Sequence, residues 1–172
     1  MMRLSPPIDF MKWIDNNRHL LKPPVGNKII YEDGDFMIMV IGGPNSRKDY
    51  HVDPVEEFFY QLEGDMVLKI IEDGKRVDIP IKQGEIFLLP KKVPHSPQRN
   101  DNTVGLVIEY KRDEGELDYF QWYCDNCDAL LHEISLDLED IVSQLPPLFK
   151  KYWDDLALRT CDQCGAIQDP PE

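Results

Sequence analysis

The four cysteines are the residues whose spacing most directly points to chemistry. They form two C-x-x-C pairs, Cys124 with Cys127 and Cys161 with Cys164. Two such pairs can bring four thiolates to one tetrahedral zinc or iron ion, and a reducing compartment disfavours disulfides. We expect a closed, structural metal site in a cytoplasmic protein. Free thiols, or a redox or iron-delivery role, are the alternatives.

A second group of polar residues lies between residues 47 and 99. Its spacing is that of two short motifs, His51-x5-Glu57-x6-Gly64 and Gly84-x5-Pro90-x4-His95. These motifs resemble those of the cupins, β-barrel proteins in which residues from both motifs converge on a metal ion. The resemblance implies that the two segments meet inside a barrel.

This chain departs from the cupin pattern at two places. Asp53 replaces the second histidine of the first motif, and Arg99 stands where the second motif usually ends in asparagine. The resemblance therefore leaves three ligands, His51, Glu57 and His95. Two imidazoles and one carboxylate form the facial triad that leaves positions open on Fe(II) for a chelating substrate and O2. This ligand set favours an oxygenase.

A closer resemblance covers nearly the whole chain. Seven segments look like those of the 3-hydroxyanthranilate 3,4-dioxygenase family and occur in the same order: 20–27, 42–45, 57–62, 86–90, 95–99, 122–125 and 143–149. The chain resembles the form of this family that carries the C-terminal metal knuckles.

The resemblance implies a ring-opening reaction with a small-molecule substrate and O2. Family members convert 3-hydroxyanthranilate to 2-amino-3-carboxymuconate semialdehyde, which closes without an enzyme to quinolinate, a precursor of NAD on the kynurenine pathway. The substrate is an ortho-aminophenol that bears a carboxylate. Its phenolate oxygen and amine nitrogen can chelate iron, whereas its carboxylate needs a fixed cation.

Further residues match positions that surround the active site in the family. They are expected to take part in catalysis or substrate binding, together with the ligand Glu57. Arg99 follows His95 by four residues, and its planar guanidinium can bind the substrate carboxylate bidentately. Glu109 matches a substrate-contacting position and is expected to orient Arg99. Arg47 matches the residue beside O2, where a cation stabilises developing negative charge. Asn27 matches a position near the site.

Each of these residues also has a plain structural interpretation. An arginine or glutamate near a strand end is usually a solvated charge or part of a surface ion pair, which applies above all to Arg47 and Glu109. Asp49 and Asp53 are either hydrogen-bond partners of the ligand imidazoles or solvated turn acids. Glu56 is expected to point outward, because adjacent strand residues face opposite sides.

The elements that must position these residues are mainly short β-strands. Apolar runs alternate with turn residues, among them Asp73-Gly74, a strong hairpin signal. Strands are expected at residues 28–31, 36–41, 57–62, 66–72, 76–81, 86–89 and 104–110. Such a series without intervening helices favours an all-β jelly-roll barrel, the fold that the cupin resemblance also implies.

Helices are expected only at the two ends of the chain. Asp9 caps an N-terminal docking helix that reaches about residue 21, because the prolines that follow forbid its continuation. The charged run 111–118 is interpreted as a linker. Beyond it, Asp137 caps the first of two short helices, 137–145 and 147–155, joined at Pro146.

The sequence pattern changes near residue 112, where the strand-like apolar runs give way to a charged segment and the cysteine pairs, and this change predicts two domains. Residues 1–112 are expected to form the cupin catalytic domain with its docking helix. Residues 113–172 are expected to form a rubredoxin-like or zinc-ribbon-like extension that binds the second iron or zinc ion. Because cupins commonly pair through exposed strands and N-terminal segments, we also expect a homodimer.

Charge and hydropathy narrow the classes of function. The 172 residues include 32 acidic and 19 basic side chains, a formal net charge of -13, which repels phosphate backbones and anionic lipids. No apolar run approaches the roughly 18 residues that span a bilayer, so we expect neither nucleic-acid nor membrane binding. Two alternatives to the dioxygenase stay open: another metal-dependent cupin, either an isomerase or a related aminophenol or catechol dioxygenase, and a non-catalytic cupin that binds a small acid.

Overall fold

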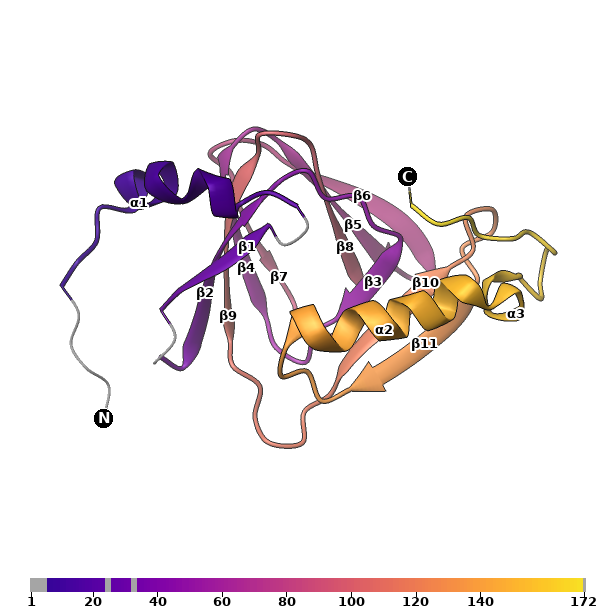
Figure 1. Cartoon of the computed structure of the whole chain (residues 1–172). Helices are drawn as coiled ribbons and strands as arrows, with labels where there is room; N and C mark the ends of the chain where they lie inside the picture. The colour runs from indigo at the N-terminus through magenta and orange to yellow at the C-terminus, as the bar shows by residue number, and fades with distance from the viewer. Residues whose placement is uncertain (1–5, 24–25, 32–33, 172) are drawn as a thin grey trace.

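The strands of the protein form two antiparallel sheets. The computed structural model describes residues 6–23, 26–31 and 34–171. The strands are β1 (Asn27–Tyr31), β2 (Phe36–Gly42), β3 (Asp49–Val52), β4 (Glu57–Glu63), β5 (Met66–Glu72), β6 (Lys75–Ile81), β7 (Ile86–Leu89), β8 (His95–Arg99), β9 (Val104–Tyr110), β10 (Asp118–Tyr123) and β11 (Leu130–Leu136). One sheet has the order β1-β2-β9-β4-β7 and the other β11-β10-β3-β8-β5-β6 (Figure 1).

This arrangement confirms the predicted all-β jelly-roll barrel. All seven expected strands are present, and their ends differ from the prediction by at most one residue. The β5–β6 hairpin turns at Asp73-Gly74, where both residues have positive φ, 49° and 73°, as a type I′ turn requires. The barrel core lies between the two sheets and includes Phe59, Leu68 and Val107.

Four strands lie outside the sequence prediction: β3, β8, β10 and β11. The strand β3 has only four residues, too few for its alternation to identify a strand, and β8 is polar with Pro97 inside it. Because β10 pairs with β3, the six-stranded sheet continues past residue 112. The division into two domains at that residue stays a prediction.

The N-terminal helix is confirmed and covers part of the outer barrel surface. It comprises α1 (Phe10–Asn17) and a 3-10 turn (Arg18–Leu20), and the Asp9 carboxylate accepts a hydrogen bond from the Lys12 N–H at 3.1 Å. Ile14 is fully buried against Val40 and Val104 of the five-stranded sheet. The helix is therefore held by apolar packing outside the barrel.

The prediction of two C-terminal helices joined at Pro146 is wrong. One helix, α2 (Ile141–Asp154), contains both Pro146 and Pro147, and a short α3 (Leu156–Arg159) follows it. Asp140 rather than Asp137 caps α2, since its carboxylate accepts from the Ser143 N–H at 3.2 Å. Each proline removes a helical hydrogen bond, so the helix needs compensation from packing.

That compensation comes from an aromatic cluster between α2 and the six-stranded sheet. Tyr152 of α2 stacks on Trp122 of β10 with ring centroids 4.3 Å apart, and Phe149 lies edge-on to Phe120 at 5.5 Å. Trp122, Phe120 and Tyr152 are at most 2% exposed. Burial of this much apolar surface outweighs the two missing hydrogen bonds. The cluster lies on the same sheet face as His51, which is paired with Phe120.

None of the helices among the described residues is both long and apolar enough to cross a bilayer.

Candidate functional site

The structure brings His51, Glu57 and His95 together at one end of the barrel. His51 and His95 lie directly opposite each other where β3 pairs with β8, with ring centroids 5.3 Å apart. Glu57 is the first residue of β4 in the other sheet, and its Oε1 lies 2.7 Å from His95 Nε2. One ligand atom from each residue lies within 4.8 Å of the other two. The predicted set can therefore share one ion.

The surroundings of these atoms fit a bound cation. Glu57 Oε1 is buried and accepts no hydrogen bond of good geometry from the described residues, despite its closeness to His95. A buried, unsatisfied carboxylate oxygen is costly unless a cation faces it. His95 Nδ1 lies 3.0 Å from the Val93 carbonyl, to which it can only donate, so Nε2 is free to act as a ligand. Both features are those of a metal site.

The Glu57–His95 pair is electrostatically matched. Burial favours the neutral form of each group, but the mutual attraction outweighs it: His95 holds the pKa of Glu57 below its ordinary value, and Glu57 holds that of His95 above its ordinary value. Glu56, the neighbouring residue, is exposed as expected. The carboxylate of Glu57 is therefore ionised and available as a ligand.

Three more carboxylates surround the pair, and one arginine holds all three. Arg112 Nη2 lies 2.6 Å from Asp53 Oδ2 and 2.8 Å from Asp118 Oδ1, and Nη1 bonds Glu109. Asp118 Oδ1 in turn lies 2.6 Å from His51 Nε2. Arg112 and Asp118 were not among the predicted site residues, because both lie in the charged run interpreted as a linker. The one sequence feature that could have pointed to Arg112 is its position three residues after Glu109.

This end of the barrel gathers buried acidic side chains that disfavour one another's ionised forms. Burial and the neighbouring Glu109 raise the pKa of Asp53 to about 9, and burial together with Glu57 raises the pKa of Glu109. Four buried acidic side chains meet here, those of Asp53, Glu57, Glu109 and Asp118, and Arg112 pairs with three of them. A divalent cation would favour the ionised forms of these carboxylates. The residues present therefore fit the metal implied by the family resemblance.

Arg99 is a buried cation with donor capacity to spare. Its side chain donates from Nη1 to Gln61 Oε1 at 3.0 Å, whereas Nε has no partner among the described residues. A Cβ at Gly105 would lie 3.0 Å from Nη1, so glycine there leaves room for the guanidinium. Burial lowers the pKa of Arg99 to about 10. A buried guanidinium with an unpaired N–H suits a carboxylate ligand.

Arg47 lies close enough to Glu57 to interact with its charge, and it is less buried than Arg99. Its Nε donates to Asp49 at 3.0 Å, and its charge acts on both Glu57 and His95. Asp49 is therefore neither a partner of a ligand imidazole nor a solvated turn acid. Asp53 likewise is 2% exposed and bonds Arg112 rather than a histidine.

The remaining two candidates lie on the five-stranded sheet. Glu109 faces Glu57 across the β9–β4 pairing and bonds Arg112, whereas Arg99 bonds Gln61. The predicted orientation of Arg99 by Glu109 therefore has no hydrogen bond to support it. Asn27 pairs with Ile41, which pairs with Gly105, which in turn pairs with Gln61. Residues paired across neighbouring strands share one face of the sheet, so Asn27 lies on the inner face with Gln61, the partner of Arg99.

The four cysteines form a separate cluster at the far end of β10. The Sγ atoms of Cys124 and Cys164 are 3.5 Å apart and those of Cys127 and Cys161 3.6 Å apart, and all four lie within 4.8 Å of one another. Tetrahedral thiolates on a zinc ion with 2.3 Å bonds would be about 3.8 Å apart. The cluster therefore has the spacing of a closed four-thiolate metal site and not of disulfides.

The two cysteine pairs lie on equivalent turns. Cys124 N donates to Ala129 O at 2.8 Å, and Cys161 N donates to Ala166 O at the same distance. The residues after the second cysteines, Asp128 and Gly165, have positive φ, 61° and 74°. Each turn aims its two thiols at the same side, so the pairs form one site when they meet.

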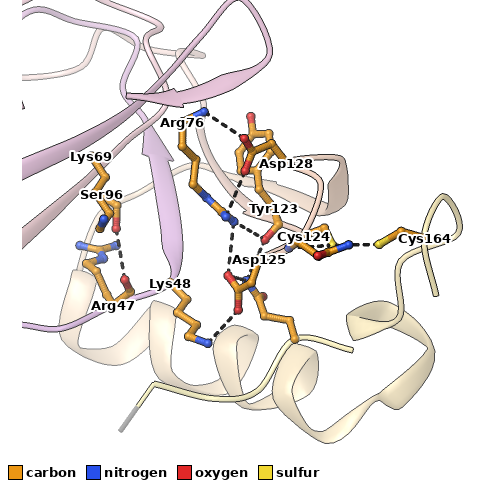
Figure 2. A network of polar contacts seen from close by, with 12 residues as sticks. Arg47, Lys48, Lys69, Arg76, Ser96, Tyr123, Cys124, Asp125, Asp128 and Cys164 are labelled. Carbon is orange, nitrogen blue, oxygen red and sulfur yellow. Dashed lines mark hydrogen bonds and ion pairs between the residues drawn. The ribbon is translucent and has the colours of Figure 1, made fainter. Parts of the chain in front are cut away.

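Polar contacts tie the cysteine cluster to the barrel (Figure 2). Arg76 of β6 donates to the Tyr123 carbonyl at 2.8 Å and lies 3.1 Å from Asp128. Lys48, the neighbour of Arg47, lies 2.9 Å from Asp125. The first cysteine turn is thus held by Arg76 of the six-stranded sheet and by Lys48, which directly precedes β3 of that sheet.

Comparison with known proteins gives a consistent set of relatives. The model of a family described as 3-hydroxyanthranilic acid dioxygenase matches residues 2–153. The protein named 3-hydroxyanthranilate 3,4-dioxygenase from Jannaschia sp. (strain CCS1) is 56% identical over 176 residues, which cover 100% of this chain and 97% of that relative. The protein of the same name from Xanthomonas campestris pv. campestris (strain 8004) is 56% identical over 169 residues, which cover 98% and 96% of the two chains.

Among solved structures, a cupin-2 domain containing protein from Shewanella frigidimarina superposes with a TM-score of 0.43 and 21% identity. The match covers 61% of this chain and 94% of that one. The two sequence relatives cover 100% and 98% of this chain, so both alignments include the barrel and the four-cysteine region.

Proposed function

Because this chain belongs to the 3-hydroxyanthranilic acid dioxygenase family, we propose that it opens the ring of 3-hydroxyanthranilate with O2 and with Fe(II) held in the barrel. The chain is an enzyme of the 3-hydroxyanthranilate 3,4-dioxygenase type, as its relatives indicate. The proposed product is 2-amino-3-carboxymuconate semialdehyde, which closes to quinolinate on the kynurenine route to NAD. The cytoplasm is the proposed compartment.

One observation carries the metal in this proposal. Glu57 Oε1 is a buried carboxylate oxygen that faces His95 Nε2 at 2.7 Å and has no other hydrogen-bond partner among the described residues, and His51 completes the set. Such a two-histidine, one-carboxylate set would hold Fe(II), which supplies open positions for a chelating aminophenolate and O2. The carboxylates nearby are held by Arg112, which leaves Glu57 as the free anionic ligand.

Arg99 is proposed to bind the substrate carboxylate. Gln61 accepts from Nη1 and thereby fixes the plane of the guanidinium, while the unpaired Nε offers a donor to an incoming oxygen. In a buried site this charge-assisted bond orients the ring, so that the amine and phenol groups face His51 and His95. Asn27 and Glu109 are proposed to contact the substrate from the five-stranded sheet.

Arg47 is proposed to serve the oxygen side of the reaction. Its guanidinium acts electrostatically on Glu57 and His95 and is held by Asp49, so it is a fixed positive charge near the ligand set. A preorganised cation of this kind stabilises negative charge that develops on oxygen without the cost of reorganising solvent.

The four-cysteine cluster is proposed to hold a structural iron or zinc ion. Its four thiols lie within 4.8 Å of one another, and no histidine or carboxylate of the described residues belongs to the group. A four-thiolate site with no open position contributes folding free energy rather than chemistry.

The proposed function is tested by an aerobic assay of Fe(II)-loaded protein. Addition of 3-hydroxyanthranilate should consume one O2 per substrate and produce the absorbance of the semialdehyde. The matched control is 2-aminophenol, which keeps the chelating pair but lacks the carboxylate, and it should react far more slowly. Substrate binding without O2 uptake would indicate a non-catalytic binder. Isomerisation without O2 would indicate another metal-dependent cupin.

The expected homodimer is also a proposal. Four apolar side chains on the outer face of the five-stranded sheet are between 44% and 65% exposed: Phe36, Ile86, Leu88 and Tyr110. We expect a second copy of the chain to cover this face. Sedimentation equilibrium should detect a dimer for the parent and a monomer for Leu88→Asp.

A further inference from the structure

The metal end of the barrel offers more than one set of ligands. Besides His51, Glu57 and His95, two other groups place one donor atom each within 4.8 Å of the others: His51 with Asp53 and Asp118, and Asp53 with Glu57 and Glu109. The three sets overlap, so a cation entering this end of the barrel has alternatives. The two alternative sets contain more carboxylates, and carboxylate ligands suit hard cations such as Mn(II) or Mg(II) better than a two-histidine set does.

Arg112 distinguishes these sets. Of the four carboxylates involved, those of Asp53, Glu109 and Asp118 are bonded by its guanidinium, and only that of Glu57 is not. The five donors of a guanidinium form a rigid planar fork, which lets one side chain bond three carboxylates in different directions. The same three carboxylates belong to the two alternative sets.

The position of Arg112 explains how it reaches them. It follows β9 of the five-stranded sheet, while Asp53 follows β3 and Asp118 begins β10, both in the six-stranded sheet. The side chain thus crosses from one sheet to the other beside the metal ligands, and it is 12% exposed. A buried arginine against buried carboxylates has the geometry of a fixed element and not of a surface ion pair.

We propose that Arg112 is a positioning residue that selects the metal ligand set. By holding Asp53, Glu109 and Asp118 it withdraws their oxygens from competition and leaves His51, Glu57 and His95 to bind a single ion. Through Asp118, which lies 2.6 Å from His51 Nε2, it also fixes the ring of that ligand. This inference rests on the metal site of the proposed function and assigns its selectivity to a residue outside the ligand set.

The test is Mn(II) binding to protein whose four-cysteine site is already filled with zinc. Mn(II) is poorly held by thiolates and well held by carboxylates. The number of ions per chain is measured by equilibrium dialysis, and coordinated imidazole is measured by the nitrogen modulation of the Mn(II) electron spin echo. The parent should bind one ion with a two-histidine signature.

Arg112→Gln should change that signature. We expect either a second Mn(II) per chain or one ion with weaker nitrogen modulation, because the freed carboxylates become ligands. Arg18→Gln is the control: it also removes one arginine that bonds carboxylates, but its partners Asp15 and Glu63 belong to none of the three sets. It should keep one ion and the parent's nitrogen signal.

A rescue separates selection from general damage to the fold. Asp53 is the member common to both alternative sets, so adding Asp53→Asn to Arg112→Gln should restore a single ion with two-histidine modulation. A merely structural arginine would not be rescued in this way. If Arg112→Gln does not fold, Arg112→Lys is measured by the same criterion, since an ammonium cannot reach three carboxylates in different directions.

The outcomes are distinguishable. A parent that binds no Mn(II) in the barrel would overturn the proposed metal site and this inference together. A parent that binds one ion, with the same stoichiometry, affinity and nitrogen signal in the Arg112 variant, would overturn the inference alone.

Discussion

The barrel site and the four-cysteine cluster are two candidate metal sites built in opposite ways. The barrel site takes unlike donors from strands of both sheets, buries them, and surrounds them with charged side chains. The cysteine cluster takes four identical donors from two equivalent turns, and two of its cysteines, Cys127 and Cys164, are exposed. One site depends on long-range strand pairing, whereas the other depends on local turn geometry.

This difference predicts a division of labour. The barrel site keeps unused binding capacity: its donors are of different kinds, Arg99 Nε has no partner among the described residues, and Glu57 Oε1 faces only His95. The four thiols satisfy a tetrahedral ion completely, so no capacity is left for a substrate. Reactivity should therefore depend on the barrel ligands, and the integrity of the C-terminal region on the cysteines.

The largest expected effect is the loss of a barrel ligand. His51→Ala, Glu57→Ala and His95→Ala should each weaken iron binding by more than about 100-fold, since even the loss of a residue that only supports a ligand costs 10- to 100-fold. Turnover should be abolished while the circular dichroism of the barrel is unchanged. Iron content and O2 uptake provide the measurement. Full iron occupancy with normal turnover in any one variant would disprove the ligand set.

The next effect concerns Arg99, which makes the barrel site specific for an acid. Arg99→Ala should cost about 2–5 kcal/mol of substrate or transition-state binding, or about 30- to 4,000-fold in kcat/KM, because it removes a buried charge-assisted contact. Arg99→Lys should rescue only part of this, since an ammonium lacks the planar fork.

The control for Arg99 is the substrate without its carboxylate. The rate with 2-aminophenol should be low in the parent and nearly unchanged in Arg99→Ala, because the contact that is lost does not exist for that molecule. Equal losses with both compounds would instead assign Arg99 to the packing of the site around Gln61 and Met66.

The same contrast explains how much the sequence could predict. Seven strands were predictable because their apolar alternation is local, and the cysteine cluster was predictable because C-x-x-C turns have a fixed geometry. His51, Glu57 and His95 were predictable as a set only through the resemblance to cupin motifs. Their convergence depends on the pairing of β3 with β8, one strand of four residues and one polar strand that contains a proline.

Arg112 and Asp118 could not be predicted for a physical reason. A run of charged residues is ordinarily solvated, and only the pairing of β10 with β3 buries this one beside His51. The helix across Pro146 and Pro147 was equally hidden, because local propensity forbids it and tertiary packing on Trp122 stabilises it. In each case a contact distant in sequence overrides a local rule.

A smaller effect on activity is expected from the cysteine cluster. Replacing Cys124 and Cys161 together by serine should abolish the second metal and loosen the region from residue 122 onward, as proteolysis and hydrogen exchange would show. Ring opening by freshly iron-loaded protein should stay within a few-fold of the parent. Immediate loss of turnover with iron still bound in the barrel would give the cysteine site a catalytic role and so remove the division between the two sites.

The smallest expected effect is on the free energy of unfolding, and it comes from an ion pair that should depend on neither metal site. Arg18 beside α1 bonds Glu63 at 2.7 and 2.8 Å, and this contact holds the pKa of Glu63 below its ordinary value. A carboxylate with a lowered pKa in the folded state adds stability above its unfolded pKa of about 4.5 and loses it as the pH falls through the folded value. Since both side chains are partly exposed, the contribution should be about 0.5 kcal/mol.

Urea unfolding of the parent and of Glu63→Gln, with and without added metals, measures this contribution. The difference in unfolding free energy should be constant above about pH 5.5, should fall as the pH drops below about 4.5, and should vanish only below the lowered pKa of Glu63 in the folded protein. Asp15→Asn, which removes the more exposed partner of the same arginine, is the control and should have a smaller effect. Metals should raise the stability of both proteins equally, because α1 packs outside the barrel and away from both sites. A difference that followed metal occupancy would instead mean that the docking helix is coupled to one of the two sites, and their comparison would then have to include the helix.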